Sequence, residues 1–348
     1  MRFECGYIVC EGGCVHWLAT KGSALNRRHF LASLGLCGLS GPLMGALAEP
    51  ARGENLLRFA HITDLHMTSR EQGRYPGAHR HVALLVDQLN EEALDFVLFT
   101  GDMIHFVSDL DTELGALRAA LGRLKHPYYC AFGNHDVEGP SLKARKRWWM
   151  ERLGDSGLAL GDASYSIALP GGVRLVVLDT TDVDGNAYHT WQGCLGDRQL
   201  AWLKQCLRSA RDETIFLALH HPPTVPWPGM DALAMETRSA QALAGILREH
   251  ATVQVILGGH YHIGLSREWC SATLLCGPSL VEHPHAWRLL TVERLGARAG
   301  LVRHEWRYLP MDPDHHLACA IGPAGWRGWG LHALSQVAES HCFITLPN

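Results

Sequence analysis

Five short polar clusters, each directly after an apolar run, constrain the fold of this chain more than any other feature. The clusters are Asp64-Leu65-His66, Gly101-Asp102, Gly133-Asn134-His135-Asp136, His220-His221-Pro222-Pro223 and Gly259-His260-Tyr261-His262. The runs before them are typical of buried strands and cover residues 59–62, 96–99, 128–132, 215–219 and 253–257. Because the carboxyl ends of parallel strands meet at one edge of a sheet, the five clusters predict one site.

The side chains in these clusters are those that bind divalent cations. They supply carboxylates, imidazoles and one carboxamide, and they include no thiolate. A mixed oxygen and nitrogen set suits Mn, Fe, Co or Zn, whereas a purely structural zinc site normally includes thiolates. We therefore predict a dinuclear metal centre with two divalent cations. We expect Mn or Fe there, with Zn and Co as the alternatives.

The order of the clusters resembles the signature of the calcineurin-like metallophosphoesterase superfamily. That signature reads D-x-H, G-D, G-N-H-D/E, H and G-H-x-H, and the resemblance covers roughly residues 56–308. It implies an α/β fold: a β-sandwich of two mixed sheets flanked by helices, in four layers (α-β-β-α). Apolar strand patterns alternate with helical patterns over the same residues, which agrees with this expectation.

The resemblance also implies a set of metal ligands. Asp102 is expected to bridge the two cations, because a shared anion offsets their mutual repulsion. The remaining ligands implied are Asp64, His66 and His262 at the first site, and Asn134, His220 and His260 at the second. His220 and His221 compete for one ligand position. The H-x-P pattern of the family favours His220 and leaves His221 to contact substrate or solvent.

Two further residues are expected to act without binding metal. By resemblance His135 faces the phosphate, where it stabilises charge or protonates the leaving alkoxide. Asp136 follows it directly, and we expect this carboxylate to hold the imidazole of His135. The alternative is that His135 only supports its loop. His105 occupies the position where purple acid phosphatases carry an iron-binding tyrosine, so that type of enzyme is disfavoured.

The resemblance is strongest to class III cyclic nucleotide phosphodiesterases and bacterial glycerophosphodiesterases. It rests on residues 133–136, on 220–223 and on the stretch 193–203. It implies hydrolysis of small phosphodiesters, with hydroxide generated at the metals attacking phosphorus in line. One alternative is a periplasmic phosphomonoesterase that uses the same centre. Another is a non-catalytic envelope protein that keeps the metals for stability.

Charge argues against a polymeric nucleic acid as the partner. The chain carries a net charge of −4. Residues 1–48 hold four Lys or Arg and two Asp or Glu, so without them 27 basic side chains face 33 acidic ones, a net charge of −6. An acidic body without a basic stripe is poorly suited to gripping a phosphate backbone. We expect a small phosphate ester as substrate instead.

The N-terminal segment resembles a twin-arginine export signal. Arg27 and Arg28 precede Phe30 and Leu31, and the apolar run that follows ends in an A-x-A pattern at Ala48. We expect export by the twin-arginine machinery, cleavage after Ala48, a periplasmic location and no stable membrane span. An ordinary secretory signal and an uncleaved anchor are the alternatives. Residues 1–24 are longer than the charged region of a signal usually is, and a translation start further downstream would explain them.

The expected domains are an export signal at residues 1–48, a metallophosphoesterase domain at 49–310 and a tail at 311–348. The tail is rich in Gly, Pro and Trp, and the sequence assigns it no role. Seven cysteines follow residue 48. Cys270 and Cys276 flank a predicted strand turn, and we predict a disulfide between them.

Overall fold

The computed structural model describes ten segments of the chain: residues 5–9, 15–19, 53–69, 75–105, 110–137, 142–153, 163–182, 191–226, 231–310 and 341–347. They belong to two units, Met1–Pro50 and Ala51–Asn348. In the first unit, β1 (Cys5–Val9) and β2 (Val15–Ala19) pair antiparallel. The twin-arginine segment and Ala48 lie outside the described residues, so the export signal stays a prediction. Among the described residues, no helix is both long and apolar enough to cross a bilayer.

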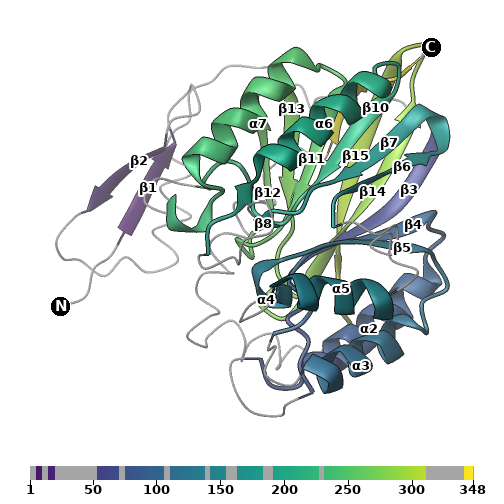
Figure 1. The fold of residues 1–348 in the computed structure, drawn as a ribbon, viewed down its shortest axis with the longest axis vertical. Helices are drawn as coiled ribbons and strands as arrows, with labels where there is room; N and C mark the ends of the chain where they lie inside the picture. The colour runs from purple at the N-terminus through teal and green to yellow at the C-terminus, as the bar shows by residue number, and fades with distance from the viewer. Residues whose placement is uncertain are drawn as a thin grey trace, which may run out of the picture. The chain divides into compact units, whose positions relative to one another are not determined.

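The second unit contains two mixed sheets of six strands each, with helices on their outer faces (Figure 1). In spatial order, the first sheet is β16 (His341–Thr345), β15 (Ala299–Tyr308), β14 (Ala286–Arg294), β3 (Glu54–Ile62), β4 (Phe96–Thr100) and β5 (Tyr128–Ala131). The second is β12 (Leu265–Trp269), β13 (Ala272–Cys276), β11 (Val253–Gly258), β10 (Thr214–Ala218), β7 (Val173–Val177) and β6 (Tyr165–Leu169). The expected α/β fold with two mixed sheets is confirmed.

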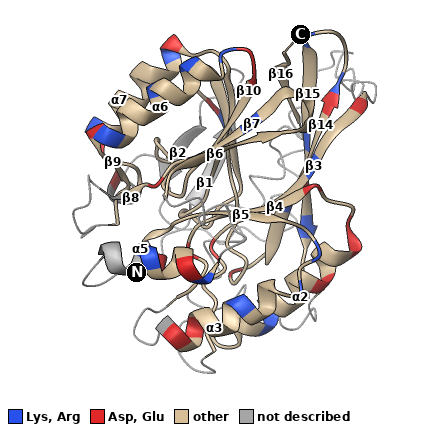
Figure 2. Ribbon diagram, turned by 45° about the vertical axis from the view of Figure 1, so that its right-hand side comes forward, with Lys and Arg blue, Asp and Glu red and all other residues tan. Residues whose placement is uncertain are grey.

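Helices cover both sheets. They are α2 (Ala78–Glu91), α3 (Leu110–Leu121), α4 (Asn134–Val137), α5 (Leu142–Arg152), α6 (Asp197–Ser209) and α7 (Thr237–Glu249). Two short strands, β8 (Thr181–Asp182) and β9 (Cys194–Leu195), pair with each other. Lys, Arg, Asp and Glu residues are distributed along α2, α3, α6 and α7, as expected for an outer layer facing water (Figure 2).

The apolar residues of the second sheet alternate between two cores. On β10, Phe216 and Ala218 belong to a core that contains residues of both sheets. Ile215 and Leu217 belong instead to a core shared with α6 and α7. Successive strand residues point to opposite faces, so a strand covered on both sides is apolar throughout. This explains why the runs in the sequence are continuous rather than alternating.

The parallel strands carry the polar clusters. β3, β4 and β5 run parallel in the first sheet. In the second sheet, β7, β10, β11 and β13 run parallel. The five runs predicted to be strands form β3, β4, β5, β10 and β11. Their carboxyl ends therefore point toward shared sheet edges, as the sequence predicted.

Part of the C-terminal tail completes the first sheet. Strand β16 pairs antiparallel with β15, with Leu301 opposite Phe343. Ile344 and Leu346 are buried in the core that contains both sheets. A domain that ends at residue 310 therefore omits one of its own strands. This strand has no distinctive local pattern, because a strand of five residues is defined by the partner with which it pairs.

The predicted disulfide between Cys270 and Cys276 is wrong. Both thiols are free; that of Cys270 is exposed in the turn before β13, and that of Cys276 is buried at the far end of this strand. A strand rises about 3.3 Å per residue, so six residues separate the two by roughly 20 Å. A disulfide requires Cα atoms closer than about 7 Å.

Phe59 links the layers of the core, and its replacement should destabilise the fold. Its buried ring stacks on Phe96 at a centroid distance of 4.6 Å and packs against Phe216 of the other sheet at 6.1 Å. We expect Phe59→Ala to lower the free energy of unfolding by about 3–5 kcal/mol, measured by urea denaturation. The control Phe343→Ala removes a ring that is 66% exposed on β16 and should change it by less than about 0.5 kcal/mol. Equal effects would contradict this account of the core.

Candidate metal centre

Backbone hydrogen bonds hold the loops after the parallel strands together. The amide of Asp64, after β3, donates to the carbonyl of Gly101, after β4, at 3.0 Å. The amide of Gly259, after β11, donates to the carbonyl of His220, after β10, at 3.0 Å. The two sheets are joined where the amide of His260 donates to Asp64 Oδ2 at 3.0 Å. The five clusters therefore form one continuous group, as the sequence predicted.

The backbone of this group is strained. In the described part of the chain, seven residues other than glycine have positive φ, and five of them belong to the polar clusters. Those five are Asp64, His66, Asp102, His260 and His262. Left-handed backbone is uncommon for residues with a Cβ atom, and it persists where the surrounding structure holds it in place. Here it turns consecutive polar side chains inward at the ends of buried strands.

Two glycines permit the close approach of these loops. A Cβ atom on Gly133 would lie 2.2 Å from Asp102 Oδ1. One on Gly259 would lie 1.9 Å from Thr63 Oγ1 and 2.8 Å from Asp64 Oδ2. Neither position has room for a side chain, so the glycines in the G-N-H-D and G-H-x-H clusters are required by packing.

The first group of donors consists of Asp64, His66, Asp102 and His262. His262 Nε2 lies 3.2 Å from Asp64 Oδ1 and 3.0 Å from His66 Nε2. His66 Nε2 lies 3.7 Å from Asp102 Oδ2. The three carboxylate and imidazole groups of Asp64, His66 and His262 converge closely enough to hold one cation. All are buried or half-buried.

The second group of donors surrounds the other side of Asp102. His220 Nε2 lies 3.4 Å from Asp102 Oδ2 and 3.2 Å from His260 Nδ1. His220 Nδ1 donates to the carbonyl of Thr100 at 2.7 Å, which directs Nε2 at the Asp102 carboxylate; there Nε2 donates a hydrogen bond when the ring is protonated and could bind a cation when the ring is neutral. Asn134 is buried, and among the described residues its Oδ1 has no hydrogen-bond partner.

This donor set fits divalent cations. A buried amide oxygen without a partner is rare in folded proteins and indicates a missing ligand such as an ion. Asn134 Oδ1 has this property, and the nitrogens of His66 and His262 meet each other beside a carboxylate. The residues present could therefore hold two cations, one on each side of Asp102.

Buried charges hold the donor side chains against one another. Burial lowers the pKa of His220, but the carboxylate of Asp102 outweighs this and raises it to about 9. Burial likewise opposes protonation of His262, yet Glu282 and Asp64 hold its pKa well above the usual value. Burial raises the pKa of Asp102, but His220 and His135 bring it well below its ordinary range. A cation would take over the role of these protons.

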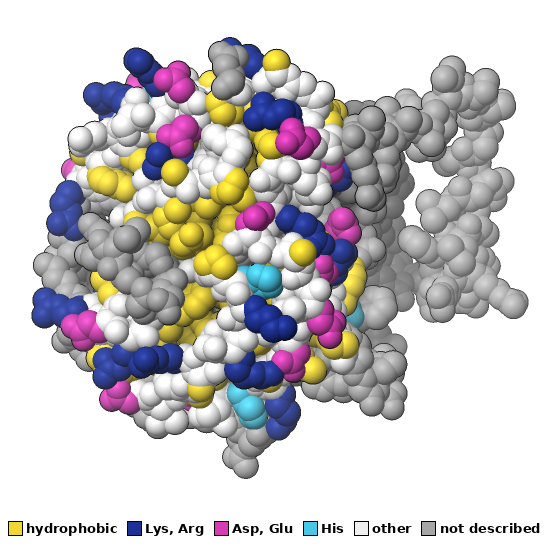
Figure 3. All heavy atoms as spheres, turned by 90° about the vertical axis from the view of Figure 1, so that its right-hand side faces the viewer, with side chains coloured by type: hydrophobic (Ala, Val, Ile, Leu, Met, Phe, Trp, Pro, Cys, Tyr) yellow, Lys and Arg dark blue, Asp and Glu magenta, His cyan; other side chains and the backbone are white. Residues whose placement is uncertain are grey.

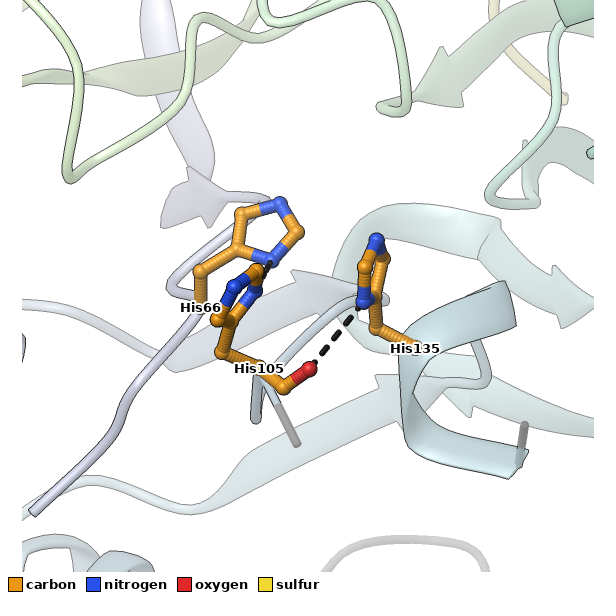
Figure 4. A group of neighbouring side chains, drawn as sticks. All are labelled: His66, His105 and His135. Atoms are coloured by element: carbon orange, nitrogen blue, oxygen red, sulfur yellow. Dashed lines mark hydrogen bonds between the residues drawn. The ribbon is translucent and has the colours of Figure 1, made fainter. Parts of the chain in front are cut away.

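His135 lies beside the first group of donors. Its Nδ1 donates to the carbonyl of His105 at 3.1 Å, and its ring lies 4.7 Å from that of His66. Figure 4 shows the three imidazoles together, with His135 at the start of α4 and its second nitrogen directed away from the His105 carbonyl. The carbonyl fixes the tautomer, so Nε2 of the neutral ring is an acceptor at the site.

Asp136 does not hold the imidazole of His135, and that expectation is wrong. Its Oδ1 accepts the amides of Met103 at 2.8 Å and Ile104 at 3.2 Å, and its Oδ2 accepts that of Gly133 at 2.8 Å. Burial and the charge of Asp102 raise the pKa of Asp136 to about 7, against the effect of these amides. Asp136 therefore joins the loops after β4 and β5 and takes no part in orienting His135.

His221 was expected to contact either substrate or solvent. The second of these expectations is wrong, because the side chain does not reach solvent. Its side chain is fully buried, its Nδ1 lies 2.8 Å from Thr180 Oγ1, and its ring packs 4.4 Å from that of His260. Burial lowers its pKa well below the usual value. His220, by contrast, directs Nε2 at Asp102. The geometry agrees with the H-x-P pattern in placing His220 against Asp102, while His221 lies with His220 and His260 in a group whose donor atoms are close enough to hold a cation.

Three residues that surround the first group of donors were not expected there. Glu282 Oε2 lies 3.1 Å from His262 Nδ1, and Tyr75 donates its hydroxyl to Glu282 Oε1 at 2.7 Å. His105 Nδ1 lies 3.3 Å from His66 Nδ1. No motif marks Glu282, which follows β13, or Tyr75, which precedes α2, whereas His105 stands three residues after Asp102 at a position that the sequence had already singled out. Glu282 and His105 contact the Nδ1 atoms of His262 and His66, so they can orient these two imidazoles toward a cation.

Comparison with known proteins agrees with this geometry. A family model described as calcineurin-like phosphoesterase matches residues 57–264. A cAMP/cGMP dual specificity phosphodiesterase from Mycobacterium tuberculosis is 30% identical over 227 residues, which are 62% of this chain and 64% of that enzyme, a little under two thirds of its length. A 3′,5′-cyclic adenosine monophosphate phosphodiesterase from Pseudomonas aeruginosa is 27% identical over 279 residues, 78% of this chain and 91% of that enzyme.

Solved structures show the same fold. A dimetal phosphatase from Danio rerio superposes with a TM-score of 0.59 at 18% identity and covers 74% of this chain and 99% of its own. At this level of identity the similarity extends to the arrangement of the sheets and helices alone.

Removal of the Glu282 carboxylate should weaken cation binding at the first group of donors. We expect Glu282→Ala to lower the affinity for Mn²⁺ there by about 10- to 100-fold, because His262 loses the acceptor that orients it. Glu282→Gln keeps an acceptor oxygen, so its affinity for Mn²⁺ should lie between that of the unchanged protein and that of Glu282→Ala. Titration calorimetry measures both, and Glu268→Ala, which removes an exposed carboxylate from β12, is the matched control. An unchanged affinity in Glu282→Ala would rule out the orienting role.

Proposed function

Because this chain belongs to the calcineurin-like phosphoesterase family, we propose that it hydrolyses small phosphodiesters with two divalent cations held on either side of Asp102. The observation that carries this proposal is the position of Asp102 Oδ2, which lies within 3.7 Å of His66 Nε2 and 3.4 Å of His220 Nε2. One carboxylate oxygen thus faces both groups of donors. That is the arrangement a bridging ligand requires.

Each side chain then has a distinct task. The first cation would be held by Asp64, His66, His262 and Asp102, and the second by Asp102, Asn134, His220 and His260. Bound cations supply Lewis-acid stabilisation of charge at phosphorus and lower the pKa of water in the site. The mixed oxygen and nitrogen donors, without a thiolate, support Mn or Fe as the native metals.

His135 is the proposed group for the leaving oxygen. Its Nδ1 is committed to the His105 carbonyl, so proton exchange with the substrate takes place at Nε2. Its ring lies next to that of His66, beside the first group of donors. In its protonated form it donates a proton to the departing alkoxide or stabilises the charge that develops there.

Two observations support a small substrate. The relatives reported above are named as phosphodiesterases of cyclic nucleotides, and a cyclic nucleotide is the leading candidate. On the face shown in Figure 3, basic and acidic side chains are interspersed without a stripe of one sign. Such a surface gives no track for the backbone of a nucleic acid. A glycerophosphodiester is the other candidate in this class.

Turnover of bis(p-nitrophenyl) phosphate tests the proposal. We expect the protein to hydrolyse it in the presence of Mn²⁺ and to lose the activity on chelation. Asp102→Ala should abolish both turnover and the binding of two metals, measured by elemental analysis. His135→Ala should keep the metals and lower kcat by about 10²- to 10⁴-fold.

The outcomes separate this proposal from its alternatives. Turnover of mono- but not bis-(p-nitrophenyl) phosphate would identify a phosphomonoesterase with the same centre. A folded protein with two metals, no turnover and no change in His135→Ala would identify a metal-binding protein without catalysis.

We also propose that the chain is exported through the twin-arginine route and acts in the periplasm. Arg27 and Arg28, the apolar run after them and the A-x-A pattern at Ala48 support this. A route that carries folded proteins allows metals to be loaded before export. A scavenging role outside the cytoplasm then accounts for hydrolysis of external phosphate esters.

Replacement of the paired arginines tests the export route. We expect the double substitution Arg27→Lys and Arg28→Lys to retain the full-length protein in the cytoplasm. The unchanged protein should appear in the periplasmic fraction with a mass that corresponds to cleavage after Ala48. Arg2→Lys, a conservative change in the same segment, is the control. Equal export of all three would contradict the proposal.

A further inference from the structure

A tryptophan stands exposed at the edge of the donor groups. Trp191 is 55% exposed, and in the described residues only Phe343 has a larger exposed fraction among the large hydrophobic side chains. Trp is highly buried on average, so an exposed indole ring beside a reaction centre calls for a specific cause. Phe343, in contrast, lies on the edge strand β16 at the end of the chain.

The segment that carries Trp191 is attached to the wall of the site. Gly193 lies so close to His221 that a Cβ atom there would be 2.3 Å from the His221 Cβ. The amide of Cys194 donates to the carbonyl of Thr180 at 3.0 Å, and Gln192 Nε2 donates to the carbonyl of Asp231 at 2.9 Å. The indole is therefore held at the rim by the residues that follow it.

The ring also has a defined position relative to the reacting groups. It meets the imidazole of His135 edge-on, with ring centroids 5.7 Å apart. The ring of His135 in turn lies 4.7 Å from that of His66. Trp191 is thus one ring further from the metal donors than the proposed acid. A substituent on the phosphate ester that extends past His135 would reach the indole.

We propose that Trp191 is a stacking platform for the nucleobase of a nucleotide substrate. This inference rests on the proposed phosphodiesterase function and specifies its substrate class. An exposed indole face gives a base a large, flat contact area, and stacking tolerates any base. The platform therefore favours nucleotides over diesters without an aromatic group, and it does not select between adenine and guanine.

Binding of paired ligands to the metal-loaded protein tests this platform. 5′-AMP and ribose 5-phosphate carry the same phosphate and sugar, and only the first has a base. We expect 5′-AMP to bind roughly 5- to 100-fold more tightly, since stacking on an aromatic side chain contributes about that factor. Trp191→Ala should abolish this difference and leave the affinity for ribose 5-phosphate unchanged. Trp191→Phe should retain most of it.

Titration calorimetry measures these affinities without any turnover, so the inference and the proposed function can fail separately. If bis(p-nitrophenyl) phosphate is not hydrolysed but Trp191→Ala still removes the preference for 5′-AMP, the platform stands and the catalytic proposal falls. If the unchanged protein turns over the diester but binds both ligands equally, the platform is overturned. The control Phe343→Ala removes another exposed ring and should alter neither affinity.

Phosphocholine provides the competing explanation. An exposed indole can also bind a quaternary ammonium group through a cation–π contact, which would suit a choline-bearing glycerophosphodiester. If Trp191→Ala weakens phosphocholine binding and leaves the ratio of 5′-AMP to ribose 5-phosphate unchanged, the nucleobase proposal is overturned. A loss confined to 5′-AMP supports it.

Discussion

The buried carboxylate of Asp102 is the interaction on which the rest of the site depends. It lies between the histidines of both donor groups, and its Oδ1 accepts the amide of His135 at 2.8 Å. A buried anion needs compensating positive charge or hydrogen bonds. Burial raises the pKa of the Asp102 carboxyl, but the imidazoles of His220 and His135 bring it well below its ordinary range. Two cations would supply more positive charge, which explains why so many basic nitrogens converge on one oxygen.

The fold holds this arrangement at a local cost in backbone conformation. Left-handed residues at the ends of β3, β4 and β11 turn side chains inward, and each such residue costs of order 1–3 kcal/mol. The two large cores offset that cost, because the strands before these residues are buried on both faces. Asp136 contributes by joining two of the loops through backbone amides. Stability of the sandwich and geometry of the site are therefore linked.

Much of the fold and of the site was predictable from the residues. The five strands before the clusters, the hairpin of β6 and β7 and the α/β class all follow from apolar runs and turn residues. Six of the seven ligands that the signature implies lie in contact with one another: Asp64, His66, Asp102, His220, His260 and His262. The strand β16, the free thiols of Cys270 and Cys276 and the true contacts of Asp136 were missed. Strand β16 depends on pairing with β15, the two thiols are separated by the length of β13, and the contacts of Asp136 are set by the loop after β4. None of these is visible in the local sequence.

The sequence by itself determined the family, the chemistry of the donors and the edge of the sheets where they meet. They follow from five polar clusters that occur in a fixed order, each a few residues long and each after an apolar run. Only the tertiary structure decided that Asp136 joins two loops, that Glu282 supports His262 and that Trp191 stands at the rim. The physical reason is that the orientation of these side chains depends on how segments far apart in the sequence pack together. The residues around β9 and β13 are examples, and their local sequence does not show which segment they will contact.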